Sequence, residues 1–186
     1  MPGLSDFERL ALPQAEAAYN LAYWLVRNPS DAEDVVQDAY LRAFRAFGQF
    51  SGEDIRPWLL TIVRNVAYRW LSVRKRQANV ISLEDALSAR DSGQTAAIEP
   101  ASPEPSAEDL LIGHSDRALV REALAELPPA YREVVVLREL EGLSYQDIAQ
   151  IAGIPMGTVM SRLARAREQL KTRLAQAMAK EDKNAV

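Results

Sequence analysis

Apolar residues recur every three to four positions through the first 80 residues of the chain, which is the spacing of an amphipathic helix. Three helices are predicted there, at about 13–26, 30–47 and 56–76, with a break at 48–54. Ser30 stands three residues before Glu33, a pattern typical of a helix N-terminus. The predicted buried positions are Val36, Ala39, Tyr40, Ala43 and Phe47 in the second helix, and Leu59, Ile62, Val63, Val66, Trp70 and Val73 in the third.

The last 75 residues or so show the same helical spacing. Four helices are predicted there, near 115–126, 128–140, 144–152 and 156–178. Ser144 and Asp147 have the spacing of a capping box, and Gly153 is placed to end the helix that they begin. The sequence shows no strong hairpin signal, so no sheet is predicted. The expected fold class is all-α, with two small helical domains.

Residues 88–106 separate these two helical parts and have a different composition. They contain three prolines, no aromatic residue and one large apolar residue, an isoleucine. Such a segment cannot bury enough surface to offset the entropy of ordering it, so a flexible linker is predicted. The linker is also acidic, because residues 81–115 hold seven acids and one base. The expected domains are therefore 1–80, a linker at 81–114, and 115–186.

The composition excludes several classes of function. The 186 residues include no cysteine and one histidine, His114, so disulfides, thiolate catalysis and cysteine or histidine metal sites are not expected. The N-terminus lacks the basic start and apolar run of a secretory signal. No stretch approaches the roughly 18 apolar residues of a membrane span. A soluble cytoplasmic protein without cofactor or metal is expected, and not an enzyme.

The helices at 144–152 and 156–178, joined by Gly153-Ile154-Pro155, have the layout of a helix-turn-helix over 144–163. On the second helix, Val159, Leu163, Ala166, Leu170 and Leu174 share one face. Hydroxyls and guanidiniums near its start suit contacts with base edges and phosphates in a major groove. The expected DNA-binding residues here are Thr158, Ser161, Arg162, Arg165 and Arg167. The alternative is a helical hairpin with a solvated basic face.

The predicted helix at 56–76 has a second basic face. Aromatic side chains beside arginines can stack on unpaired bases while the cations hold the backbone. The candidate residues are Trp58, Thr61, Asn65, Tyr68, Arg69, Arg74, Lys75 and Arg76. The alternative assigns Trp58 and Tyr68 to the core. The helix at 30–47 is acidic instead, and its solvent side is expected to present Asp34, Gln37, Asp38, Leu41 and Arg45. A leucine among carboxylates indicates a protein partner, and the alternative is a solvated acidic face.

Three segments together resemble a bacterial sigma factor of the extracytoplasmic-function (ECF) group of the sigma-70 family. They are DAEDVVQDAYLRAF (31–44), RPWLLTIVRNVAYRWL (56–71) and LPPAYREVVVLRELEGLSYQDIAQIAGIPMGTVMSRLARAREQL (127–170). The resemblance implies that residues 1–80 correspond to region 2 and residues 115–186 to region 4. It departs from the family at Met160, where a basic residue is common, and at the acidic loop 51–56.

The resemblance also implies partners. The 31–45 helix would dock on the coiled coil of the largest subunit of core RNA polymerase through Asp34, Gln37, Asp38, Leu41 and Arg45. The 56–76 helix would capture and help melt the −10 element of promoter DNA, and the helix from 156 would read the −35 element. An anti-sigma protein is a further expected partner; no metal and no membrane insertion are expected. Two rival functions remain: an autonomous helix-turn-helix regulator, and a sigma-like decoy that sequesters an anti-sigma protein.

Overall fold

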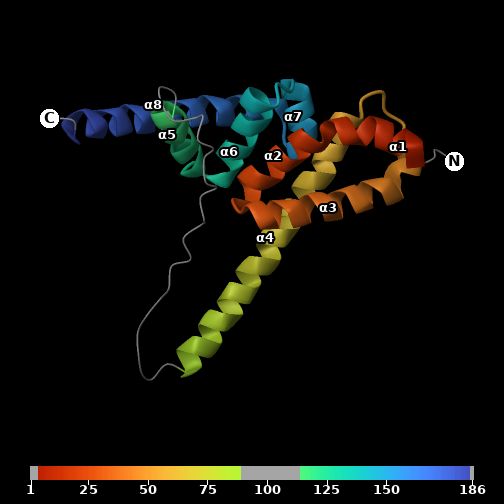
Figure 1. The fold of residues 1–186 in the computed structure, drawn as a ribbon, viewed down its shortest axis with the longest axis horizontal. Coiled ribbons are helices and arrows are strands. Elements are labelled where there is room, and N and C mark those ends of the chain that lie inside the picture. The colour runs from red at the N-terminus through yellow and green to blue at the C-terminus, as the bar shows by residue number, and fades with distance from the viewer. Residues whose placement is uncertain (1–3, 89–113, 185–186) are drawn as a thin grey trace.

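The computed structural model describes residues 4–88 and 114–184, and every regular element in those ranges is a helix (Figure 1). We call residues 4–88 the first lobe and residues 114–184 the second lobe. The linker predicted at 88–106 lies almost wholly outside the described residues. The first-lobe elements are α1 (Leu4–Ala11), the 3-10 turn η1 (Leu12–Gln14), α2 (Ala15–Val26), α3 (Pro29–Ala46), the 3-10 turn η2 (Phe47–Gln49) and α4 (Ile55–Ser88).

The core of the first lobe is formed where α2, α3 and α4 pack against one another. Its fully buried side chains include Leu21 from α2, Val35 from α3, and Leu60 and Val63 from α4. The sequence analysis missed α1, an eight-residue helix that is too short to show a periodic pattern. Its Phe7 completes a second core cluster, in which its ring meets that of Phe47 edge to face at 5.2 Å.

Two details of α3 differ from the prediction. The helix begins earlier than expected, because Asn28 is the N-cap: its side chain accepts a hydrogen bond from the Asp31 backbone N–H at 3.0 Å. Pro29 then occupies the first helical position, where its fixed φ and missing N–H are favourable. Val35 is fully buried, whereas Val36, the predicted core residue, lies at the edge of the core. Ala39, Ala43 and Phe47 are buried as predicted.

Helix α4 continues past the predicted end near residue 76 to Ser88. Residues 77–88 contain no glycine or proline, so nothing in them stops a helix. The outer half of α4 projects away from the other helices (Figure 1). Val73 is 46% exposed, which corrects its predicted burial. Leu60, which was not predicted to be buried, points into the core instead.

The second lobe contains α5 (His114–Ala125), α6 (Pro129–Val135), the π-helical turn η4 (Val136–Leu140), α7 (Tyr145–Ala152) and α8 (Met156–Asn184). The predicted capping box is confirmed. The Ser144 hydroxyl accepts from the Asp147 N–H at 3.1 Å, and the Asp147 carboxylate accepts from the Ser144 N–H at 3.3 Å. Gly153 ends α7 in the left-handed conformation, with φ of 64°. The helix predicted at 128–140 changes to a π turn in its second half, and α8 extends beyond residue 178.

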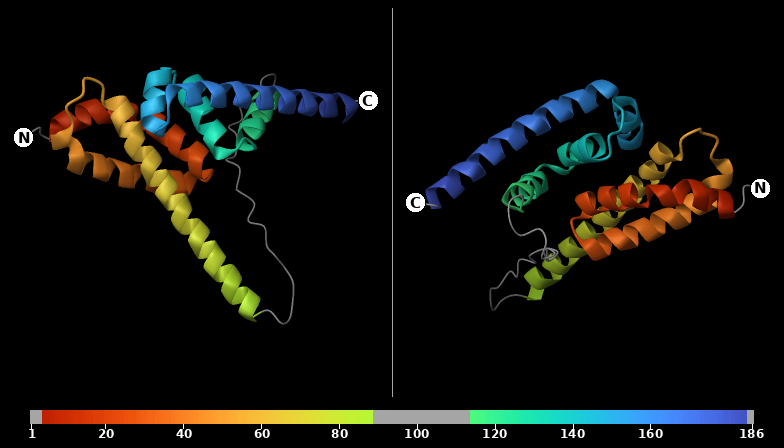
Figure 2. Two further views of the ribbon diagram at one scale, coloured as in Figure 1. Left: turned by 180° about the vertical axis from the view of Figure 1, so that it is seen from behind. Right: turned by 45° about the horizontal axis from the view of Figure 1, so that its top comes forward.

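The two lobes pack directly against each other. Helix α7 contacts α4, and α6 contacts α2, so that one cluster of buried side chains continues from the first lobe into the second (Figures 1 and 2). Sequence patterns had indicated two lobes joined through a tether, and they carried no information on a shared core. The closed arrangement therefore brings the two predicted DNA-binding helices into one compact unit.

Candidate nucleic-acid interface

The helix-turn-helix is built from α7, a tight turn and the start of α8. The turn closes through a hydrogen bond from the Ile154 N–H to the Ala149 carbonyl at 3.1 Å. Pro155 then begins the next helix, because its carbonyl accepts from the Thr158 N–H at 2.9 Å. Val159, Leu163 and Ala166 are buried, as predicted for the inner face of α8. The opposite face is thereby turned outward along its first three turns.

The outward face of α8 holds most of the residues predicted to contact DNA. Ser161 and Arg165 are exposed, and Thr158 is half-buried. Arg167 is exposed but already engaged, because its guanidinium donates to the Glu139 carboxylate at 2.7 Å. Met160 is 52% exposed on a flank of this face, so an apolar side chain stands where the resemblance expects a basic one.

The residues predicted to form the DNA-binding face of α4 differ in exposure. Asn65 and Arg69 are exposed near the middle of the helix. Thr61 is half-buried, and its hydroxyl donates to the Pro57 carbonyl of its own helix at 2.7 Å. The half-buried Trp58 packs against Phe50 with ring centroids 5.1 Å apart, which fits the core interpretation of this residue.

Arg74, Lys75 and Arg76 are exposed at the end of the part of α4 whose side chains are described. Arg74 donates to the Asp31 carboxylate at 2.5 Å and lies over the Trp70 ring, 4.9 Å from its centroid. These contacts fix the orientation of Arg74.

Tyr68 does not point into solvent with the rest of this face. Its hydroxyl donates to the Glu133 carboxylate of α6 at 3.2 Å, and the Arg64 guanidinium lies over its ring at 4.6 Å. Burial, followed by the nearby Glu133 charge, raises the pKa of Tyr68 to about 12. Tyr68 is thus a residue of the contact between the lobes in this structure.

Glu133 is a buried residue at the contact between the lobes, and the sequence analysis did not single it out. Its side chain is 0% exposed and forms an ion pair with Arg64 from the other lobe. Burial raises the pKa of Glu133 above its ordinary value, against the opposing effects of Arg64, Tyr68 and Arg162. The signal in the sequence was a carboxylate directly preceding the apolar run Val134–Leu137, in a helix that the pattern predicts to be buried.

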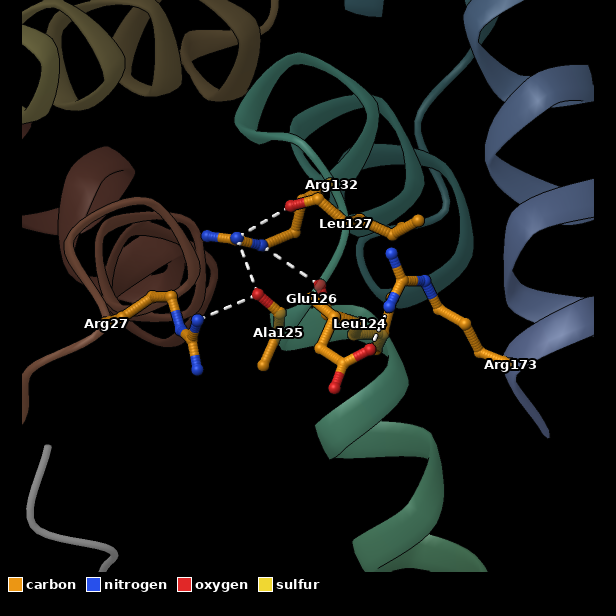
Figure 3. Close-up of polar contacts among 7 residues, drawn as sticks. All are labelled: Arg27, Leu124, Ala125, Glu126, Leu127, Arg132 and Arg173. Carbon is orange, nitrogen blue, oxygen red and sulfur yellow. Dashed lines mark hydrogen bonds and ion pairs between the residues drawn. The ribbon is translucent and has the colours of Figure 1, made fainter. Parts of the chain in front are cut away.

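Arg132, the neighbour of Glu133, is also buried, and it binds the C-terminal ends of two helices, of which Figure 3 shows the one in its own lobe. Within its own lobe it donates to the carbonyls of Leu124 at 3.0 Å and of Ala125 and Leu127 at 2.8 Å. Across the lobes it donates to the Trp24 carbonyl near the end of α2 at 2.9 Å. A cation is favourable at such helix ends, because unpaired carbonyls and the helix dipole meet there.

Arg27 forms the reciprocal contact from the first lobe. It donates to the Ala125 carbonyl at 2.8 Å (Figure 3). Burial, with a further contribution from the Arg27 charge, lowers the pKa of Arg132 to about 10, so that Arg132 is still charged at neutral pH. Arg27 is the C-cap of α2 and has a left-handed backbone with φ of 59°, which is uncommon for a residue other than glycine.

A separate surface lies on α3. Asp34, Gln37 and Arg45 are exposed, and Asp38 is half-buried and paired with Arg42 at 2.9 Å. Leu41 is 57% exposed among them. Phe44, one turn further on and 44% exposed, was not predicted, although its spacing from Leu41 puts it on a neighbouring part of the helix. Carboxylates and apolar side chains therefore share this surface.

Two profiles of known families match the chain. The profile described as Sigma-70 region 2 matches residues 14–77, and that described as Sigma-70, region 4 matches residues 117–170. These ranges contain the described side chains of α4 and the helix-turn-helix of α7 and α8, respectively. No helix in the described ranges is long and apolar enough to cross a membrane.

Individual relatives match over most of the chain. The RNA polymerase sigma-H factor of Pseudomonas aeruginosa is 35% identical over 167 residues, which cover 88% of this chain and 83% of that protein. The ECF RNA polymerase sigma-E factor of Escherichia coli K12 is 35% identical over 145 residues, covering 77% and 74%. The ECF RNA polymerase sigma factor SigE of Mycolicibacterium smegmatis is 34% identical over 172 residues; this match covers 92% of the chain and 63% of that longer protein.

Solved structures extend the similarity to the fold. The sigma factor RpoE of Bartonella quintana, crystallised with the anti-sigma factor NepR, matches with a TM-score of 0.72 and 30% identity, covering 92% of this chain and 98% of that one. CnrH, in complex with the cytosolic domain of CnrY, matches with a TM-score of 0.62 and 23% identity, covering 94% and 90%. The second match is a likeness of fold alone.

Proposed function

The chain belongs to the ECF sigma factors of the sigma-70 family, and we propose that each surface described above serves one step of promoter-directed transcription initiation. A sigma factor directs the polymerase to a promoter and is not itself an enzyme. The single observation that carries the assignment of roles is the order of the two lobes: a region 2 match on the lobe with the α3 and α4 surfaces, followed by a region 4 match on the helix-turn-helix.

The second lobe is proposed to read the −35 element in duplex DNA. Ser161 and Arg165 are exposed on the outward face of α8, with Thr158 and Arg162 half-buried beside them. Arg167 would reach a phosphate after leaving Glu139. Hydroxyl and guanidinium groups at this end of a recognition helix suit both base edges and phosphates.

The first lobe is proposed to bind the −10 element. Asn65 and Arg69 are exposed at the centre of α4, and Arg74, Lys75 and Arg76 extend the basic surface along the helix. Trp58, Thr61 and Tyr68 belong to the same proposed site. Of these, Tyr68 is available for stacking on a base only after its contact with Glu133 is broken.

The α3 surface is proposed to dock on the coiled coil of the largest subunit of core RNA polymerase. Asp34, Asp38 and Arg45 supply charge, Gln37 supplies an amide, and Leu41 supplies an apolar contact at the centre. We add Phe44 to this set, because it extends the exposed apolar area next to Leu41. A surface that combines carboxylates with an apolar centre fits a partner that is basic and apolar in the matching places.

An anti-sigma protein is a further proposed partner. The support is that the sigma factor RpoE of Bartonella quintana, which matches this chain in fold and at 30% identity, was crystallised with the anti-sigma factor NepR. A pull-down from a lysate of the organism that encodes the chain, with the chain as bait, would identify the partner by mass spectrometry. Addition of core polymerase tests whether the two compete for the chain.

The test of the proposed function is run-off transcription with purified core polymerase and a library of promoter templates. Transcripts that start at defined sites only when this chain is added support a sigma factor. DNA binding by the chain alone, without transcription from any template, would support the autonomous regulator. Capture of an anti-sigma protein without DNA binding and without transcription would support the decoy.

A further inference from the structure

The outward side of α8 carries an apolar row of side chains beside a polar one. Met156, Met160 and Ala164 are exposed and four residues apart, which places them in one row along the helix. The next row, offset by one residue, holds Ser161 and Arg165, which the proposed function assigns to the −35 element. Both methionines are 52% exposed, so two large apolar side chains face water at the start of a helix proposed to read DNA.

The charge around the apolar row fits a polyanion. Residues 154–167 contain three arginines and no acidic residue, so the first three turns of α8 carry positive charge only. The first acidic residue of the helix is Glu168. An apolar row within a surface of one charge sign suits duplex DNA, which presents the methyl groups of thymine between two rows of phosphates.

Gly157 lies in the first turn of α8, between the two methionines. A Cβ atom at this position would have nothing within 4 Å, so packing inside the protein does not require a glycine here. Glycine is also among the least favourable residues for a helix. Its presence is explained if another molecule comes close to the backbone at this point, as DNA does when the start of a recognition helix enters the major groove.

The arginine on the same side of α8 as the apolar row is already engaged. Arg167 follows Met160 by seven residues, two helical turns, and its guanidinium donates to the Glu139 carboxylate at 2.7 Å. In that pair, or on a phosphate as proposed above, Arg167 does not contact a base edge. A base pair opposite Met160 therefore faces a flexible thioether chain and not a guanidinium.

The four bases differ in what they offer to such a side chain in the major groove. Guanine offers two acceptors, which suit arginine or lysine, and cytosine offers a donor, whereas thymine has an apolar group, its C5 methyl. Methionine has no hydrogen-bond donor, and its long, unbranched side chain adapts to an apolar neighbour. A base pair that contains thymine is therefore the one that a methionine favours.

We propose that Met160 is a specificity-determining residue, which selects a thymine-containing base pair in the −35 element by contact with the C5 methyl group. Met156 and Ala164 extend the apolar contact on either side of it. The proposal rests on the proposed function, because it names a base that the same helix selects. Run-off transcription tests that function separately, and the experiment below starts from a promoter that the holoenzyme transcribes.

The methyl contact is tested with duplexes that differ only in that group. Holoenzyme, formed from the full chain and core polymerase, is bound to such a promoter, and each thymine of the −35 element is replaced in turn by deoxyuridine, which lacks the C5 methyl. One of these replacements is expected to weaken binding about fourfold, the effect of losing one buried methyl group. Met160→Ala is expected to weaken binding to the thymine duplex by a similar factor and to abolish the deoxyuridine effect at that position.

Three further variants make the result specific. Met178→Ala removes another exposed methionine of α8, outside the helix-turn-helix, and is expected to change neither the affinity nor the deoxyuridine effect. Arg165→Ala is expected to weaken binding and to retain the deoxyuridine effect, because it removes a different contact. Met160→Arg is expected to transfer the preference at the same base pair from thymine to guanine, whose O6 and N7 accept from a guanidinium.

Several results would overturn the proposal. They are a −35 element without thymine, deoxyuridine replacements that all leave the affinity unchanged, and a deoxyuridine effect that persists in Met160→Ala. Loss of binding to core polymerase or to an anti-sigma protein in Met160→Ala, with unchanged DNA affinity, would also overturn it and would assign the methionines to a protein partner. Each of these results leaves the sigma assignment intact, because transcription from the promoter has already tested it.

Discussion

Arg132 and Arg27, from opposite lobes, donate to the same oxygen atom, the Ala125 carbonyl, each at 2.8 Å (Figure 3). Two cations meet there because the C-terminal ends of α2 and α5 lie close together, and both ends present carbonyls without helical partners. Burial is the main reason that the pKa of Arg132 is lowered, and repulsion from the Arg27 charge adds to it. The carbonyls hold the two guanidiniums in place despite that repulsion.

Replacing Arg132 with methionine is expected to lower the free energy of unfolding by about 1–3 kcal/mol, since several buried carbonyls then lose their donor. Urea unfolding followed by circular dichroism measures this. Arg165→Met, an exposed arginine in the same lobe, serves as the matched control and is expected to change stability by less than about 0.5 kcal/mol. If Arg132→Met lost as little stability as Arg165→Met, the carbonyls would have found other donors.

Glu133 predicts a specific dependence of stability on pH. Its pKa is raised in the folded protein mainly by burial, so the folded state binds a proton more strongly than the unfolded state does. The stability contributed by that proton is present below the ordinary value of 4.5 and is lost as the pH rises through the raised value. The wild type should therefore gain stability relative to Glu133→Gln as the pH falls from about 7 to about 5. Parallel urea titrations at the two pH values measure the difference; a constant difference would show that Glu133 does not titrate in this range.

Arg165→Ala is expected to weaken binding of the holoenzyme to duplex −35 DNA. If Arg165 contacts one phosphate, the slope of log affinity against log salt should fall by roughly 0.9. Arg162 is half-buried, so Arg162→Ala should reduce the slope by a similar amount only where DNA binding exposes its side chain. Fluorescence anisotropy over a salt series measures both. Unchanged affinity and slope for Arg165→Ala would place the DNA on another face of α8.

Asp34→Arg combined with Asp38→Arg is expected to abolish association with core polymerase. Reversing both charges opposite a basic partner can cost several kcal/mol, on the order of a thousandfold in affinity. The fold should survive, because neither side chain is part of the buried core of α3. Glu8→Arg with Glu16→Arg, exposed on α1 and α2, makes the same change in net charge and should spare association. Size-exclusion chromatography with core polymerase distinguishes the two pairs, and retention of binding by the first would move the contact elsewhere.

Features set by neighbours in sequence could be predicted, and features set by tertiary contacts could not. The Ser144–Asp147 capping box and the stop at Gly153 depend on a few adjacent residues, and both are present as expected. The exposure of Asp34 and Leu41 followed from helical periodicity alone. In contrast, periodicity could not choose between Val35 and Val36, because the direction from which α2 and α4 approach α3 decides which one is buried.

The contact between the lobes shows the same limit more strongly. Arg64 and Glu133 are 69 residues apart in the chain, and the segment between them carries no pattern that would bring them together. In the sequence, Arg64 was one base in a basic run and Glu133 one acid before an apolar run. The assignment of Tyr68 to a DNA face was consistent with its sequence, and only the fold shows that a carboxylate from the other lobe now binds it.

The left-handed backbone at Arg27 makes the residue type at this position informative in related chains. Glycine or asparagine would occupy that conformation with less strain, so local preference disfavours arginine there. An arginine at such a position is favourable only where its side chain donates to the Ala125 carbonyl of the other lobe. Among relatives, we expect drift to glycine or asparagine in lineages whose lobes no longer meet, together with loss of the arginine that corresponds to Arg132. One position at the end of a helix would then report, from sequence alone, whether a chain still closes on itself.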